Sequence, residues 1–217
     1  MDNYKFINSE NKVSNQVIKR LPRYYGILKD LENKGEVKVS SSQLARLAGT
    51  TASQIRQDFS VFGAFGQQGF GYSIENLITG INDIIGIKLQ HKAILVGAGN
   101  IGKALLNHLD FSANGFNLVG AFDTSPELIG TTVNEIKIRP LSELESFCRI
   151  NGVHTAVICV PKEAAIELVS KLYDINVYNF LNFSDYDIKM AYPDANVETV
   201  RLGNSLMCLC YMVTNFR

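Results

Sequence analysis

The chain has no excess of either charge, with 21 basic and 21 acidic residues among 217. This balance excludes the global positive field of a protein that coats polyanions, so any contact with nucleic acid must come from local patches. No apolar run approaches the ~20 residues of a membrane-spanning helix. The opening segment, MDNYKFINSENK, has no apolar core of a signal peptide. We therefore expect a cytoplasmic protein of one large domain or two small ones.

Cysteine is scarce, and no two cysteines form a C-x-x-C pair. We therefore expect no metal site and four reduced, structural thiols, as in a cytosolic protein. The four are Cys148, Cys159, Cys208 and Cys210. Cys159 falls in an apolar run, where a small buried thiol is typical. Cys208 and Cys210 are two positions apart on an expected helix, so they face different ways.

A glycine-rich turn is the most informative feature that is present. The apolar run Ala93–Val96 predicts a buried strand, and Lys103–Leu109 predicts the helix that follows the turn. The turn between them has the spacing G-x-G-x-x-G, and the next apolar run, Leu118–Phe122, ends at Asp123. Such glycines allow a tight turn and close approach of the backbone to a pyrophosphate, while the acid accepts hydrogen bonds from ribose hydroxyls. The turn consists of Gly97, Ala98, Gly99, Asn100, Ile101 and Gly102.

The turn predicts a dinucleotide site, and the acid indicates which dinucleotide. A carboxylate at Asp123 repels a 2′-phosphate, and no basic residue stands near it in the sequence, which favours NADH and NAD+ over the phosphorylated forms. The alternative is an ordinary glycine-rich turn in an α/β domain.

The N-terminal part has the pattern of a helical DNA-binding unit. Pro22 and Gly35 suit the start and the end of a first helix, whose apolar stripe is Tyr24, Tyr25, Leu28 and Leu31. Ser40–Gln43 and Thr51–Gln54 are two capping-box patterns, separated by the break at Gly49-Thr50. We expect Leu44, Leu47 and Ala48 on the inner face of the first short helix, and Ile55 and Phe59 on that of the second.

Two short helices across a tight turn are typical of a helix-turn-helix. The outward face of the second helix carries groups that reach base edges and phosphates, namely Ser53, Gln54, Arg56 and Gln57. Aromatics then alternate with glycines in Phe62–Tyr72, which predicts a hairpin and hence a winged helix. Its tip has no positive charge, which weakens the expected affinity. The pair of helices could instead be a plain packing or dimerisation unit.

The rest of the chain alternates apolar strands with helices, which predicts a doubly wound parallel sheet. Leu77–Leu89 predicts a connecting helix before it. Further strands are expected at Thr155–Val160 and Val177–Leu181, with a helix at Lys162–Tyr173 that faces inward through Ala165, Ile166, Val169 and Leu172. The domains expected are residues 1–86, 87–202 and 203–217. The last is a helix, Gly203–Phe216, whose stripe of Leu206, Leu209, Cys210 and Val213 packs on a partner subunit or on its own domain.

These features together resemble the Rex family of redox-sensing transcriptional repressors over almost the whole chain. The matching segments are Arg20–Tyr25, Ser53–Ser60, Phe62-Gly63, Gly69–Tyr72, Gly97–Gly102, Phe122-Asp123, Val160–Ala165 and Leu181–Phe183. The resemblance implies a homodimer with swapped C-terminal helices, in which NADH releases operator DNA and NAD+ favours the DNA-bound form. It also implies cofactor contacts at Val160 and Pro161 and DNA contacts at Ser60, Gln67 and Gln68.

The chain departs from the family pattern at particular places. Gln57, Gln67 and Gln68 stand where the family usually has basic residues. A polar set that links cofactor and DNA-binding domain in the family, an arginine, a tyrosine and an aspartate, reads here as Gly26, His108 and Arg201. The resemblance therefore supports cofactor binding more firmly than a complete redox switch, and a regulator that binds the dinucleotide only structurally is the second hypothesis.

Histidine is also scarce, which bears on the third hypothesis, an oxidoreductase. Hydride transfer needs an acid or base beside the nicotinamide. His91 and His154 precede strands, so they belong at the edge of the sheet opposite the ligand, and only His108 is near the right helix. With no substrate domain evident, we do not expect an enzyme.

Overall fold

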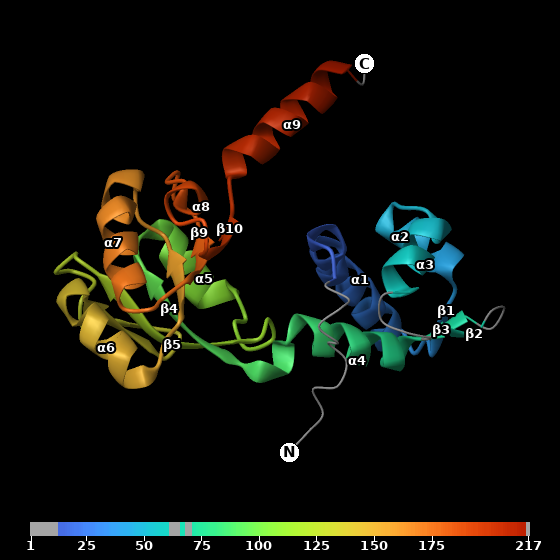
Figure 1. Cartoon of the computed structure of the whole chain (residues 1–217), viewed down its shortest axis with the longest axis horizontal. Coiled ribbons are helices and arrows are strands. Elements are labelled where there is room, and N and C mark those ends of the chain that lie inside the picture. The colour runs from blue at the N-terminus through green and yellow to red at the C-terminus, as the bar shows by residue number, and fades with distance from the viewer. Residues whose placement is uncertain (1–12, 61–65, 68–70, 216–217) are drawn as a thin grey trace. The chain divides into compact units, whose positions relative to one another are not determined.

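The structure is a computed structural model that describes residues 13–60, 66–67 and 71–215. Contacts along the chain divide it into two compact units, Met1–Lys88 and Leu89–Arg217. This division lies close to the boundary expected after residue 86. The two units are described separately below, with the labels of Figure 1.

The described residues of the first unit form four helices and a small sheet. In chain order they are α1 (Asn15–Asn33), β1 (Lys38–Val39), α2 (Ser41–Ala48), α3 (Ala52–Ser60), β2 (Gly66–Gln67), β3 (Gly71–Ser73) and α4 (Ile74–Ile85). All four helices contribute to one apolar cluster, in which Leu21, Leu44, Ile55 and Leu77 are almost completely buried.

The prediction that Pro22 begins the first helix was wrong. α1 begins at Asn15, where Ser14 Oγ accepts the Val17 N–H, and Pro22 lies inside the helix on its exposed side. The buried positions Val17 and Leu21 continue the helical stripe upstream of the proline. Burial of that stripe outweighs the one hydrogen bond that proline cannot donate. The end was predicted correctly, because Gly35 has φ +80°.

The two short helices are capped as expected. Ser40 Oγ accepts the Gln43 N–H at 3.0 Å, and Thr51 Oγ1 accepts the Gln54 N–H at 3.1 Å. Gly49 ends α2 in the left-handed region. One inner-face residue was wrong: Leu47 is 46% exposed, and Ala45 is buried in its place.

The wing is a three-stranded sheet in the order β1-β3-β2. β2 pairs antiparallel with β3 through Gly66 and Tyr72, as the hairpin prediction requires, while β1 was not predicted because it has only two residues. Gln68 lies outside the described residues, as does the side chain of Gln67. The connecting helix, expected at Leu77–Leu89, is α4, which begins after a Ser73 cap and ends at Gly86.

The second unit is a sheet with helices. Its elements are η1 (Ile87–Leu89, at the junction), β4 (His91–Val96), α5 (Asn100–His108), β5 (Phe116–Asp123), β6 (Thr132–Val133), β7 (Ile136–Pro140), η2 (Leu141–Glu143), α6 (Leu144–Asn151), β8 (Thr155–Ile158), α7 (Lys162–Asp174), β9 (Asn179–Asn182), α8 (Ile188–Ala191), β10 (Asn196–Thr199) and α9 (Leu202–Asn215). The predicted strands exist with shifted ends. β6, β7 and β10 were missed because their sequences are polar at alternate positions or very short.

The strand order is β10-β9-β8-β4-β5-β7-β6, with every pair parallel except β6 with β7. The chain runs outward from β4 to β7 on one side and then returns to build β8, β9 and β10 on the other. The order therefore reverses between β4 and β8, and ligands of such sheets bind at the carboxyl ends of the strands at this point.

The two faces of the sheet are covered unequally. Ile94 and Val96 point into a large apolar cluster with residues of α6, α7 and α8, whereas Leu95 belongs to a smaller cluster. Among the described helices, only α5 contributes to the smaller one, and Leu181 and Phe183 there are only partly buried. One predicted inner residue, Ile166 of α7, is 47% exposed, and Leu168 is buried instead.

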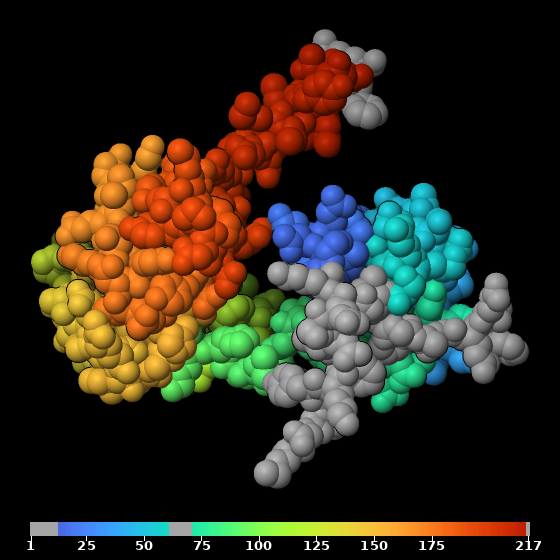
Figure 2. Space-filling view, viewed as in Figure 1, coloured from blue at the N-terminus to red at the C-terminus, as the bar shows by residue number. Residues whose placement is uncertain are grey.

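α9 has no buried residue between Leu202 and Asn215. Its large apolar side chains, which include Leu206, Met207, Tyr211 and Val213, are 52% to 73% exposed. Figure 2 shows this helix, coloured red, with its side chains uncovered. The alternative that the last helix packs on its own domain was therefore wrong.

The four cysteines are free thiols in two kinds of environment. Cys148 is buried and Cys159 partly buried, and burial raises the pKa of these thiols to about 11 and about 12. Cys208 and Cys210 on α9 are exposed. In the described part of the chain no helix is both long and apolar enough to cross a membrane.

Candidate functional sites

The glycine turn lies where the strand order reverses, between β4 and α5. Gly97 has φ +96°, and a Cβ there would lie 2.6 Å from the carbonyl oxygen of Cys159 and 2.8 Å from a methyl carbon of Val160. A Cβ on Gly102 would overlap the carbonyl oxygen of Gly97. These two glycines are therefore required for the turn to pack against its own domain.

Gly99 differs from both, because nothing lies within 4 Å of the position of its Cβ. It occupies the N-cap of α5, and no side chain caps this end of the helix. The first hydrogen bond of α5 runs from Lys103 N–H to the Gly99 carbonyl. The N–H groups of the first turn are consequently available to an anion, and the helix dipole favours one.

Asp123 connects the end of β5 to this turn. Its Oδ2 accepts the Ala98 N–H at 2.6 Å, and its Oδ1 accepts the Ser125 N–H at 2.8 Å. Each carboxylate oxygen can accept more than one hydrogen bond, so the half-buried carboxylate retains acceptor capacity for hydroxyl groups. The sequence predicted the ribose contact but not the contact that holds the turn.

A pocket of about 240 Å³ lies beside the start of α5. Its lining includes Ile101, Phe183, Asp185 and Arg201. The loop after β9 is fixed by buried groups, since Asn182 Oδ1 accepts hydrogen bonds from the N–H and the hydroxyl of Ser184. The glycine turn, Val160 and this pocket thus lie along one edge of the sheet. Pro161, the other cofactor residue expected there, occupies the N-cap of α7.

In the first unit, α3 carries the predicted DNA-contacting residues. Ser53, Arg56, Gln57 and Ser60 are exposed, and an Arg56 Nη donates to Ser41 Oγ at 3.2 Å. Gln54 is only half-buried rather than fully outward, because its side chain bonds to Asp58 of the next turn. The Gln54 side chain is therefore not used in the second capping box, and only Thr51 caps the start of α3.

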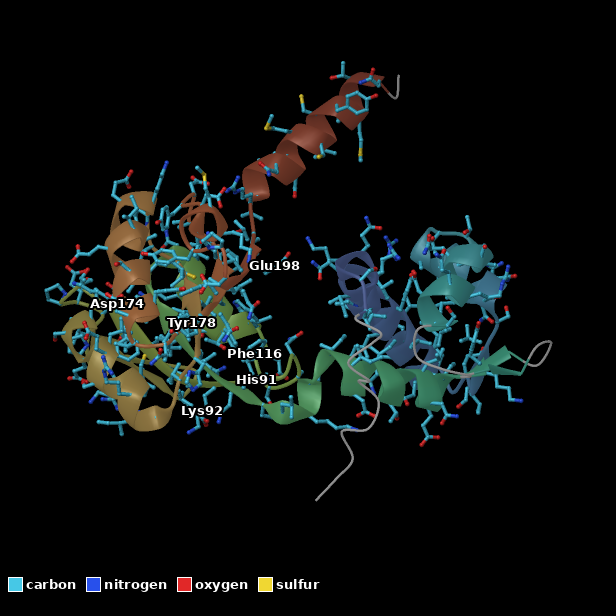
Figure 3. All side chains as sticks on the ribbon, viewed as in Figure 1. His91, Lys92, Phe116, Asp174, Tyr178 and Glu198 are labelled. Atoms are coloured by element: carbon cyan, nitrogen blue, oxygen red, sulfur yellow. The ribbon has the colours of Figure 1, made fainter. Side chains whose placement is uncertain are left out.

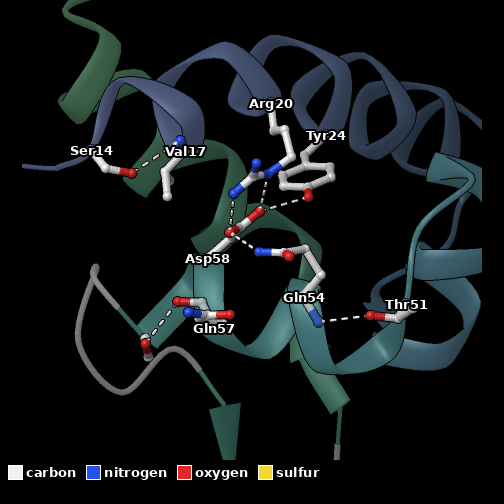
Figure 4. Close-up of polar contacts among 9 residues, drawn as sticks. Ser14, Val17, Arg20, Tyr24, Thr51, Gln54, Gln57 and Asp58 are labelled. Atoms are coloured by element: carbon white, nitrogen blue, oxygen red, sulfur yellow. Dashed lines mark hydrogen bonds and ion pairs between the residues drawn. The ribbon is translucent and has the colours of Figure 1, made fainter.

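Asp58 is the centre of a buried polar cluster that the sequence analysis missed (Figure 4). Arg20 donates to both carboxylate oxygens at 2.7 Å, Tyr24 Oη donates at 2.7 Å, and Gln54 Nε2 donates at 2.8 Å. Asp58 is completely buried, while the Arg20 side chain is 33% exposed. The spacing of four residues in each helix was the available signal, since such positions are neighbours on one face.

The electrostatics of the cluster follow from burial and hydrogen bonding. Burial alone would raise the pKa of Asp58, but hydrogen bonds from Arg20, Tyr24 and Gln54 outweigh it and hold the pKa below its usual range. Burial, together with the bond to Asp58, raises the pKa of Tyr24 to about 12. Asp58 is therefore an ionised carboxylate whose charge is satisfied inside the domain.

The three residues of the expected switch set lie in different settings. Gly26 is exposed on α1, with nothing within 4 Å of the position of a Cβ. His108 is exposed at the end of α5. Arg201 precedes α9 and is paired loosely with Asp187, at 3.9 Å.

The other two histidines lie at the amino ends of strands. His91 begins β4 beside Phe116, which begins β5, and the two rings are 6.1 Å apart (Figure 3). His154 directly precedes β8 and contacts the carbonyl of Asn176. Both are at the edge of the sheet opposite the glycine turn. Among the described residues no group of His, Cys, Asp or Glu is arranged to bind a metal ion.

These features define a class of protein, a winged-helix DNA-binding domain followed by a Rossmann-type nucleotide-binding domain. Two family models agree with this division. Residues 12–60 match a model described as a putative DNA-binding protein N-terminus, and residues 88–186 match one described as a CoA binding domain.

Relatives along the whole chain identify the family. A redox-sensing transcriptional repressor Rex of Caldicellulosiruptor saccharolyticus is 42% identical over 202 residues, which are 93% of this chain and 92% of that one. The Rex of Clostridium novyi is 39% identical and covers 97% and 100% of the two chains. The chain belongs to the Rex family of redox-sensing transcriptional repressors, which is a family of repressors rather than of NAD-dependent oxidoreductases.

Solved structures agree with this membership. A crystal structure of RSP in complex with β-NAD+ and operator DNA has a TM-score of 0.86 and 36% identity, over 94% of both chains. A structure of RSP with β-NADH has a TM-score of 0.84 and 34% identity, over 93% of this chain and 94% of the other. RSP is itself described as a Rex-family repressor.

Proposed function

We propose that this chain is a transcriptional repressor that binds operator DNA through α3 and binds NADH and NAD+ at the turn Gly97–Gly102. The observation that carries the cofactor site is the contrast between the glycines of the turn. Gly97 and Gly102 are closed in by their own domain, whereas Gly99 faces open space at an uncapped helix N-terminus. A glycine that the fold does not need is explained by close approach of a pyrophosphate.

Asp123 supports a nicotinamide dinucleotide with free ribose hydroxyls. Its carboxylate is oriented by two backbone N–H groups before any ligand arrives. RSP has been crystallised with NADH and with NAD+. We propose the same ligands here, held by Gly97–Gly102 and Asp123, with Val160 and Pro161 along the adjacent strand end.

DNA binding is supported by the exposed polar face of α3. Ser53, Arg56, Gln57 and Ser60 lie along it, and a cationic guanidinium beside neutral amides suits phosphate and base-edge contacts together. The predicted contacts of Gln67 and Gln68 from the wing remain part of this proposal.

We propose a homodimer in which α9 packs on the partner subunit. An apolar helix exposed along its whole length needs a covering surface. The smaller apolar cluster of the sheet, which only α5 covers among the described helices, offers the kind of surface that a doubly wound sheet normally covers with further helices. A two-fold dimer implies a palindromic operator.

A second candidate, a regulator that uses the dinucleotide structurally with little redox response, is favoured by one observation. Gly26 has no side chain, and Arg201 is paired with Asp187, so the arginine–aspartate contact expected from the resemblance cannot form between these positions.

The experiment is a calorimetric titration of the full chain with NADH, NAD+, NADPH and coenzyme A, followed by the same titrations of Gly99→Val. We expect NADH and NAD+ to bind, the two ligands with a ribose phosphate to bind far more weakly, and Gly99→Val to abolish binding without unfolding the protein. Unchanged NADH binding by Gly99→Val contradicts the proposed site.

A further inference from the structure

The recognition helix α3 carries a completely buried carboxylate, which is costly unless every charge and lone pair is used. Asp58 meets this condition with four hydrogen bonds of 2.7 to 2.8 Å. Three come from α1, through Arg20 and Tyr24, and the fourth comes from Gln54 on α3 itself. Gln54 is partly exposed, so its amide could be solvated by water and does not need the bond to Asp58.

The bond to Asp58 fixes which end of the Gln54 amide points inward. An ionised carboxylate only accepts hydrogen bonds, so the nitrogen of Gln54, and not its oxygen, has to face Asp58. The carboxylate stays ionised because Arg20 is paired with both of its oxygens. Among the described residues no donor contacts Gln54 Oε1, so this oxygen is left as an unused acceptor.

Gln57 provides the contrast on the same helix. It is exposed, and among the described residues its side-chain amide makes no hydrogen bond, while its backbone carbonyl accepts one from Ser60 Oγ at 2.8 Å. Its amide can present either its oxygen or its nitrogen to a base. Gln54 lies about one turn before Gln57, at the border of the exposed face, and its bond to Asp58 gives its amide a single orientation.

Given the DNA binding proposed above, we propose that Asp58 is a positioning residue that orients Gln54 to read a base-edge amine in the major groove through Oε1. In the major groove, adenine presents an N6 amine and cytosine an N4 amine, whereas guanine O6 and thymine O4 are acceptors. An outward oxygen therefore selects adenine or cytosine on the strand that Gln54 faces and rejects guanine and thymine. Arg20 and Tyr24 on α1 support this orientation indirectly, because they hold the Asp58 carboxylate in place.

The first test is selection of binding sites from a random duplex library by the full chain, by Gln54→Met and by a control, Gln16→Met. Gln16 is an exposed residue of α1 outside the cluster, so the control makes the same chemical change elsewhere. We expect Gln54→Met to lose a preference for adenine or cytosine at one position of each half-site by roughly 3- to 10-fold, the worth of one hydrogen bond. The salt dependence of affinity should not change, because no phosphate contact is removed.

A second variant separates orientation from mere presence of the amide. Asn at position 58 both donates and accepts, so Asp58→Asn releases the Gln54 amide to turn either way. We expect the preference at the same base pair to broaden to guanine or thymine while Gln54 is retained. If Asp58→Asn does not fold, Gln54→Glu replaces it. Repulsion from Asp58 turns that carboxylate outward, and because a carboxylate only accepts hydrogen bonds, the preference for adenine or cytosine should remain; a gain of guanine or thymine overturns the proposal.

The outcomes distinguish this proposal from the proposed function. Gln54→Met that is less stable but keeps every base preference shows a purely structural role and overturns the proposal. A guanine or thymine preference that is lost with Gln54 also overturns it. Wild-type protein that selects no duplex sequence contradicts DNA binding itself.

Discussion

Replacement of Asp58 by alanine tests whether the buried cluster stabilises the DNA-binding unit. The substitution leaves the donor groups of three side chains, Arg20, Tyr24 and Gln54, without their acceptor. The buried Tyr24 hydroxyl loses the carboxylate that accepts its 2.7 Å hydrogen bond, whereas Arg20 is partly exposed and can turn to water. An unsatisfied buried hydroxyl costs about 1–3 kcal/mol.

The expected loss of unfolding free energy is about 3 kcal/mol. Roughly 2 kcal/mol comes from the Tyr24 hydroxyl and about 1 kcal/mol from the Arg20 and Gln54 bonds, which solvent screens. For a domain of 60–100 residues such a loss lowers the melting temperature by about 12–24 °C. The matched control is Asp83→Ala, since Asp83 forms an exposed pair with Lys88 in the same unit. It should change stability by no more than about 0.5 kcal/mol.

The assay is urea unfolding of both variants, followed by circular dichroism across a range of pH. The pKa of Asp58 is depressed in the folded state, so its stabilisation is fully present above the unfolded pKa of about 3.9 and is lost as pH falls through the lower folded pKa. The difference between wild type and Asp58→Ala should be constant above about pH 5 and shrink below about pH 4. A difference under about 0.5 kcal/mol, or one that acid leaves unchanged, refutes the reasoning.

Three further predictions concern ligands. NADPH should bind several kcal/mol more weakly than NADH because Asp123 faces its 2′-phosphate, and equal affinities in calorimetry would contradict this. Arg56→Ala should cost roughly 1–3 kcal/mol of operator affinity. Site selection should show a base preference at the position facing Gln57 that differs from that of relatives with a basic residue there, and recovery of the unchanged family operator would count against this second expectation. With His108 and Arg201 in place of the family's polar set, the difference between NADH and NAD+ in releasing DNA should be smaller than in a typical relative by about 1–2 kcal/mol, and complete release by low NADH would show that other residues carry the switch.

The parts of the fold that sequence predicted are those with strong local signals. The glycine turn, the capping serine and threonine of α2 and α3, and the apolar strands β4, β5 and β8 each depend on residues close together in the chain. The start of α1 was misplaced because proline is a stronger local signal than Ser14, while tertiary burial of Val17 and Leu21 decided the helix. β7 and β10 were missed because pairing with a neighbouring strand, and not their own composition, makes them strands.

The candidate sites divide in the same way. The turn and Asp123 were predicted from local motifs, but the bond from Ala98 to Asp123 depends on the pairing of β4 with β5. The cluster at Asp58 could not be predicted from sequence alone, since Arg20 and Asp58 are 38 positions apart and meet only when α1 packs on α3.

A dinucleotide bound at the glycine turn is expected to control the binding of DNA by α3. The most direct measurement is fluorescence anisotropy of a labelled operator bound to the full chain, titrated with NADH and with NAD+, for wild type and Gly99→Val. We expect NADH to weaken the complex more than NAD+ does, and neither to affect the Gly99→Val complex, which should still bind DNA. A wild-type complex that responds to neither cofactor, or a Gly99→Val complex that responds as wild type does, contradicts the claim.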